Sequence, residues 1–188
     1  MNFVTPFIQP MPPITDRFLN ALEFTLRWEG GFSTHPDDPG GATNFGVTQR
    51  VYDAFRKKNS LRLQSVKQID RKEVLSIYQS DYWLVVDCEK IAPPMDFVHF
   101  DTCVNFGPFQ AAKFLQQALS VLPDGYIGQI TLLTLSKSDP RLVAGIVCDE
   151  RIKFRHERVR QNASQEKFLQ GWLNRDNALK KLATELLD

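Results

Sequence analysis

The chain has 188 residues, of which 43% are hydrophobic and 24% are charged, and its formal net charge is +1. This composition excludes a disordered or fibrous protein, and the near-neutral charge gives no electrostatic case for nucleic acid as a partner. The three cysteines are isolated in the sequence, and neither they nor the three histidines show the spacing of a metal site. We therefore expect no disulfide framework and no metal.

Residues 1–14 are rich in proline and lack a basic segment, which predicts an extended arm and not a signal peptide. A helix is expected next, from Thr15 or Asp16 to about Glu29. Apolar side chains at helical spacing form one stripe of this helix, and Glu29 ends that stripe. A carboxylate on a helix face that otherwise packs into the core either disturbs the packing or has a function.

The segment Gly30–Gly46 holds too many glycines and prolines for a helix, and it predicts turns with a short, irregular β-hairpin. Helical spacing resumes directly after it and is followed by a polar connecting loop over residues 56–68. Asp70 and Glu73 then show the pattern of a capping box, which predicts a helix through Trp83.

The second half of the chain is helical in pattern. We expect helices over residues 97–106 and from Pro108 onward, a long helix from Pro140 to about Arg160, and a last helical region from about Ser164. The predicted fold class is α+β but mostly α, with one small β/turn insertion after the first helix.

Glu29 and the polar residues of the glycine-rich segment form the candidate catalytic set. Turns that glycine permits bring Asp37, Asp38, Thr43 and Asn44 back towards Glu29. Hydrolysis of a glycosidic bond requires two carboxyl groups, one protonated and one ionised. The apolar stripe favours the acid role for Glu29, and the polar turn favours an ionised Asp38, with Asp37 as the alternative.

Six motifs follow one another along most of the chain. They are Glu29-Gly30-Gly31-Phe32, Pro36-Asp37-Asp38-Pro39-Gly40-Gly41, Thr43-Asn44-Phe45-Gly46-Val47-Thr48, Asp101-Thr102-Cys103-Val104-Asn105-Phe106-Gly107, Asp124-Gly125-Tyr126-Ile127-Gly128-Gln129-Ile130-Thr131 and Phe168-x-x-Gly171-Trp172-x-x-Arg175. Together they resemble glycoside hydrolase family 108, whose members are N-acetylmuramidases, many of them phage endolysins. The fifth motif is similar to the D-G-x-x-G-x-x-T pattern of that family's peptidoglycan-binding part.

The resemblance implies a lysozyme-like fold and an enzyme that lyses cells by cutting the bond between N-acetylmuramic acid and N-acetylglucosamine in peptidoglycan. It implies no metal and no organic cofactor. By this similarity Glu29 is the general acid, while Asp38 and Thr43 position or activate water. Asn44, Asp37 and Asn105 are the expected substrate contacts. Asn44 is also the alternative to Thr43, and Asn105 alternatively ends a helix.

The resemblance also predicts the organisation and the setting of the protein. Residues 1–95 would form the muramidase catalytic lobe, with 1–14 as its arm, and residues 96–188 a helical, peptidoglycan-binding-like lobe. Because no flexible linker divides them, we expect one compact unit and a monomer. Membrane contact by the amphipathic end, residues 177–188, is the lesser alternative to packing within the protein. An endolysin would stay in the host cytoplasm until a holin opens the membrane towards the cell wall.

Two other functions compete with this one. A lytic transglycosylase cleaves the same bond with an acid such as Glu29, dispenses with Asp38 and forms a 1,6-anhydro product. A peptidoglycan-binding or secretion-assisting protein would hold the wall without cutting it.

Overall fold

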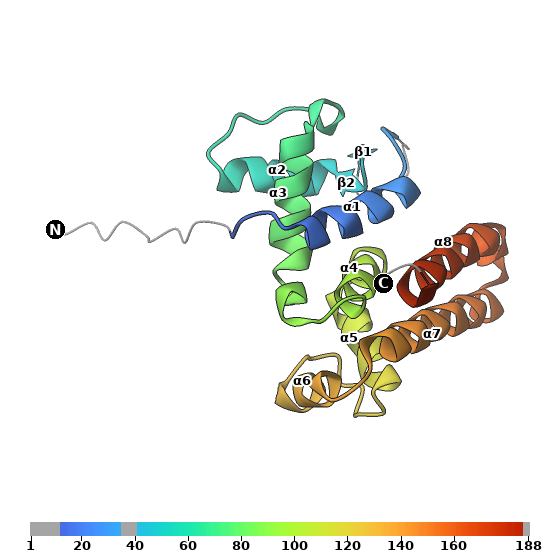
Figure 1. The fold of residues 1–188 in the computed structure, drawn as a ribbon. Helices are drawn as coiled ribbons and strands as arrows, with labels where there is room; N and C mark the ends of the chain where they lie inside the picture. Colours follow the sequence, from blue (N-terminus) through green and yellow to red (C-terminus); the bar gives the residue numbers. More distant parts are fainter. Residues whose placement is uncertain (1–11, 35–40, 186–188) are drawn as a thin grey trace.

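The computed structural model describes residues 12–34 and 41–185 and shows a mostly helical protein (Figure 1). The described part contains eight α-helices: α1 (Asp16–Trp28), α2 (Gln49–Lys58), α3 (Arg71–Tyr78), α4 (Met95–Phe106), α5 (Pro108–Ala118), α6 (Gln129–Ser136), α7 (Pro140–Gln161) and α8 (Glu166–Glu185). A two-stranded antiparallel sheet, β1 (Thr43–Asn44) and β2 (Val47–Thr48), follows the first helix. The predicted fold class is confirmed.

Local sequence signals set the ends of several helices. The Thr15 hydroxyl accepts a hydrogen bond from the Phe18 backbone N–H and caps α1. Asp70 and Glu73 form the predicted capping box of α3. That α-helix ends at Tyr78, however, and the chain continues to Trp83 as a π-helix, where Leu84 N–H donates to the Gln79 carbonyl.

The β-hairpin turns through only two residues. Thr43 pairs with Thr48 and Asn44 with Val47, so Phe45 and Gly46 form the loop. Both have positive φ angles, of 50° and 73°, as a type I′ turn requires, and this turn matches the twist of paired strands. The hairpin thus lies at the end of the glycine-rich segment.

Helix α4 is the centre of the molecule. Every residue from Met95 to Cys103 is buried, and the helix packs against α1, α5, α7 and α8 (Figure 1). An apolar helix buried on all sides is the expected core element of such a protein. Phe100 on α4 packs edge-on against Phe18 of α1 and against Trp83, with ring centroids 5.9 and 5.6 Å apart.

Helices α7 and α8 lie side by side and pack along their lengths (Figure 1). Helix α7 begins at Pro140 as predicted, and Asp139 caps it by accepting from the N–H groups of Arg141 and Leu142. Two other expectations were incomplete: α6 was not foreseen, and the presumed loop over 56–68 contains the end of α2 and a 3₁₀ turn, Val66–Gln68. Within the described ranges, no helix is long and apolar enough to cross a bilayer.

Candidate active site

Glu29 is the residue that follows the last turn of α1. Its backbone is extended, with φ −81° and ψ 137°, while its N–H still donates to the Thr25 carbonyl at 3.3 Å. A carboxylate at a helix C-terminus is unfavourable because the carbonyl groups there carry partial negative charge. The side chain is only 21% exposed, so a positive partner is expected beside it.

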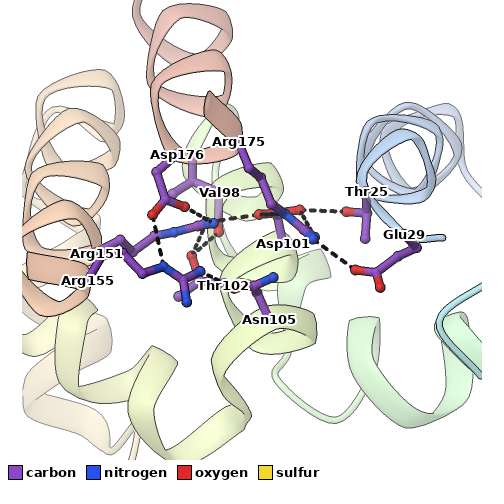
Figure 2. A network of polar contacts seen from close by, with 10 residues as sticks. All are labelled: Thr25, Glu29, Val98, Asp101, Thr102, Asn105, Arg151, Arg155, Arg175 and Asp176. Atoms are coloured by element: carbon purple, nitrogen blue, oxygen red, sulfur yellow. Dashed lines mark hydrogen bonds and ion pairs between the residues drawn. The ribbon is translucent and has the colours of Figure 1, made fainter. Parts of the chain in front are cut away.

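That partner is Arg175, which comes from α8 at the other end of the chain. Its Nη1 donates to Oε1 of Glu29 at 2.9 Å (Figure 2). Its Nη2 and Nε donate to the two oxygens of Asp101 at 2.7 and 3.3 Å. One guanidinium group of α8 therefore joins the end of α1 to α4. Of the three hydrogen bonds that Arg175 donates here, one goes to Glu29 and two go to Asp101.

The charges continue into the interior beyond Asp101. Arg151 of α7 is completely buried and lies 2.9 Å from Asp101 Oδ2 and 2.5 Å from Asp176 Oδ1. Arg155, one helical turn further, donates to the other oxygen of Asp176 at 3.3 Å. A row of alternating charges thus runs from Glu29 through α4 to the contact between α7 and α8 (Figure 2).

Neutral side chains complete this row. Thr25 of α1 donates its hydroxyl hydrogen to Asp101 Oδ1 at 3.0 Å. Thr102 accepts from Arg151 at 3.0 Å and donates to the Val98 carbonyl. Asn105 accepts from Arg155 through its side-chain oxygen. Buried charges need such partners, because each unpaired charge would cost several kcal/mol in desolvation.

The row is electrically balanced when Glu29 is ionised, because three arginines meet three carboxylates. These six residues are Arg151, Arg155, Arg175, Glu29, Asp101 and Asp176. Burial alone raises the pKa of Asp101, but the two neighbouring guanidinium groups outweigh burial and hold that pKa below its usual value. Burial lowers the pKa of Arg175, and its carboxylate partners more than reverse this. Asp101 and Arg175 are therefore both charged.

The hairpin turn forms the other wall around Glu29. A Cβ atom at Gly46 would lie 2.5 Å from the hydroxyl oxygen of Tyr78 and 2.9 Å from Oε2 of Glu29. Only glycine, which has no Cβ atom, therefore allows the turn to lie this close to Tyr78 and Glu29. Tyr78 donates to the Phe45 carbonyl at 2.8 Å, and burial, with the nearby Glu29 charge, raises the Tyr78 pKa. Tyr78 accordingly stays protonated and holds the turn in place.

The other predicted site residues are distributed around this centre. Thr43 lies in β1, and its backbone also pairs with Ser33. The Asn44 side chain is buried and donates to the Val66 carbonyl at 3.2 Å, so it fixes the hairpin to the following segment. Since adjacent strand residues face opposite sides, Thr43 faces away from Val66. Asn105, on α4, accepts a hydrogen bond from Arg155 of the charged row.

Asp37 and Asp38 lie outside the described residues, so their predicted roles remain predictions. In the part of the chain that the structure describes, no group of three or more His, Cys, Asp or Glu side chains is arranged to hold a metal ion.

Sequence reasoning had no role for Arg175 beyond its place in a motif, and none for Tyr78 or Arg151. One signal was present in the sequence: Asp101, like Asp96, stands in a helix whose other residues are mostly apolar. A charge in such a place is almost never buried without a partner of opposite charge. Which arginine supplies that partner depends on the tertiary fold, because Arg175 is 74 residues away from Asp101.

Comparison with known proteins identifies two regions of the chain. Residues 22–107 match the family model described as Glycosyl hydrolase 108, and residues 110–177 match the model described as Predicted Peptidoglycan domain. Among solved structures, SagA of Brucella abortus is similar, with 30% sequence identity and a TM-score of 0.72. The match covers 88% of this chain and 92% of that one. No curated protein matches.

The close approach of Gly46 to Glu29 predicts that Gly46→Ala displaces the carboxylate. If Glu29 is the acid of a peptidoglycan-cleaving reaction, the rate of reducing-end release from purified peptidoglycan should fall about 100-fold, because misplacement of a catalytic group by about 1 Å has effects of that size. Gly41→Ala is the matched control. Gly41 has the same φ of +73°, but an added Cβ would meet nothing closer than Gln49 Cβ at 3.8 Å. Equal losses of activity in the two variants would contradict the prediction.

The buried row predicts that Asp101→Asn is strongly destabilising. The change would remove one negative partner from Arg151 and one from Arg175, which we expect to lower the free energy of unfolding by about 3–5 kcal/mol. Asp149→Asn makes the same chemical change in a half-exposed ion pair with Lys180, and it should cost at most about 1 kcal/mol. Urea denaturation of both variants measures the difference, and similar values for the two would refute a structural role for the row.

Proposed function

Because this chain belongs to the glycosyl hydrolase 108 family, we propose that it is a muramidase. The chain is a glycosyl hydrolase with a peptidoglycan-binding domain. The proposed reaction is hydrolysis of the β-1,4 bond between N-acetylmuramic acid and N-acetylglucosamine. The observation that carries the proposal is the half-buried Glu29 carboxyl, which Arg175 holds on one side and the Gly46 turn contacts on the other.

In this proposal Glu29 is the general acid that protonates the leaving oxygen. Oε1 already accepts the Arg175 hydrogen bond, so the proton is carried by Oε2, the oxygen nearer the hairpin turn. Arg175 fixes the direction of the carboxyl group, and Asp101 takes the larger share of its hydrogen bonds.

The second carboxylate is proposed to be Asp38, with Asp37 as the alternative, and Thr43 is proposed to orient the water. An ionised carboxylate activates water or stabilises the oxocarbenium-like transition state. The support for this part is the family motif, together with the position of β1 beside the turn that contacts Glu29.

Lysis of a bacterial cell by an endolysin is the biological setting that we propose. The protein would accumulate in the host cytoplasm and reach peptidoglycan after a holin opens the membrane. Fractionation of cells that produce the wild-type protein, with and without a holin, tests this setting. We expect the protein in the cytoplasmic fraction without a holin; recovery from the periplasm in that case would contradict the proposal.

Glu29→Gln is the variant that tests the acid. Glutamine keeps the shape and can still accept from Arg175, so the fold should persist, while the rate of reducing-end release from peptidoglycan falls about 10²–10⁴-fold. Glu23→Gln makes the same change on α1 at an exposed pair with Arg71, and it should retain normal activity. More than about a tenth of wild-type activity in a folded Glu29→Gln protein would exclude Glu29 as the acid.

A further inference from the structure

A groove of about 470 Å³ lies apart from Glu29, where the loop after the π-helix meets the second half of the molecule. Its walls are Val85–Asp87, the start of α5 with Phe109, and Gly125–Ile127. The loop between α5 and α6 lies at the lower end of Figure 1, away from the end of α1. The volume is in the range of pockets that bind small ligands.

The D-G-x-x-G-x-x-T motif forms one wall of this groove, and its polar groups are used in hydrogen bonds within the protein. The buried side-chain amide of Gln116 donates to Asp124 Oδ1 at 2.7 Å, to the Tyr126 carbonyl at 2.9 Å and to the Thr131 hydroxyl at 3.3 Å. Its oxygen accepts from Gly125 N–H at 2.8 Å. These polar groups of the motif therefore face Gln116, and their hydrogen bonds give the loop a fixed shape.

Two aromatic rings are exposed to solvent at this groove, Tyr126 in the fixed loop and Phe109 at the start of α5. Gly125 has a φ of +83°, and a Cβ there would overlap the Phe109 ring, so the backbone rests directly on that ring. Tyr126 packs edge-on against Phe109, with centroids 5.8 Å apart, and Lys113 Nζ lies 4.8 Å from the Phe109 centroid. Phe109 is nevertheless 50% exposed and Tyr126 73% exposed. Rigid, exposed apolar surface of this kind marks an interaction site.

We propose that this groove is a second binding site for peptidoglycan, in which an N-acetylhexosamine ring of the glycan strand packs on Phe109 and Tyr126. A carboxylate of the same polymer, from N-acetylmuramic acid or the stem peptide, faces Lys113. The inference rests on the proposed function and specifies where the second half of the chain contacts the wall. It would keep the enzyme on an insoluble substrate between cuts at Glu29.

The chemistry of the groove favours this occupant. The C–H faces of sugar rings are apolar and pack on aromatic rings, while Lys113, on the Phe109 ring, offers a cation for an acidic group. An anionic membrane surface would need a cluster of basic side chains, whereas Asp87 lines this groove and pairs with the neighbouring Lys90 at 3.0 Å. Phe109 directly precedes the region that matches the peptidoglycan domain model, and Tyr126 lies within it.

Co-sedimentation with purified sacculi tests the proposal, using the full chain with Glu29→Gln so that the polymer is not cut. Adding Tyr126→Ala should weaken binding about tenfold, and adding Lys113→Gln about threefold. Leu122→Ala is the matched control, because Leu122 is 78% exposed in the same loop but does not line the groove. With Glu29 intact, Tyr126→Ala should cleave a soluble peptidoglycan tetrasaccharide at the wild-type rate.

Each outcome of these measurements either supports or overturns the second binding site. Weaker sedimentation of the Tyr126→Ala protein, with normal sedimentation of the Leu122→Ala control, supports the second site. Unchanged sedimentation of the Tyr126→Ala protein overturns it. If the parent protein is a dimer and Tyr126→Ala makes it a monomer without weakening sedimentation, the groove binds another copy of the chain and the proposal is likewise overturned. If the wild type releases no reducing ends but Tyr126→Ala still weakens binding, the muramidase proposal fails and the second site stands. If the wild type releases reducing ends but Tyr126→Ala binds sacculi as well as the parent protein does, the muramidase proposal stands and the second site fails.

Discussion

The ion pair between Arg175 and two carboxylates is the interaction on which the rest of this structure depends. Glu29 and Asp101 are on different helices, and both need the same guanidinium group because neither is fully solvated. This shared partner requires α8 to pack against α4 beside the end of α1. The arrangement of the last helix is therefore set by charge neutralisation at the candidate active site as well as by apolar packing.

That dependence explains why the chain is built around α4. The helix contributes Asp101 to the charged row and Phe100 to the aromatic core, so a single element joins the polar and apolar parts of the interior. The family-model boundary after residue 107 follows α4, yet α4 also packs against α5, α7 and α8. The hydrolase region alone would expose Asp101 and leave Glu29 without its arginine. The second half therefore completes the candidate active site, in addition to any contact with the wall.

Local rules predicted much of the fold and the place of Glu29 at the end of the first helix. Thr15, the Asp70–Glu73 capping box and Asp139 mark helix starts through hydrogen bonds within three residues. The position of Glu29 followed from helical spacing. Long-range pairing was not predictable in this way: nothing near Asp101 in the sequence indicates Arg175 or Arg151, since tertiary packing brings them together. Helix α6 was missed because Ile130 and Leu133, both exposed, blur its apolar face.

The central claim is that water is added across the glycosidic bond at Glu29, and the mass of the products tests it most directly. A lytic transglycosylase would use the same acid and the same bond, so loss of activity in a variant does not separate the two reactions. Mass spectrometry of muropeptides released from purified peptidoglycan by the wild-type protein does. We predict products with complete reducing N-acetylmuramic acid ends. Products lighter by one water molecule, with 1,6-anhydro ends, would contradict the claim.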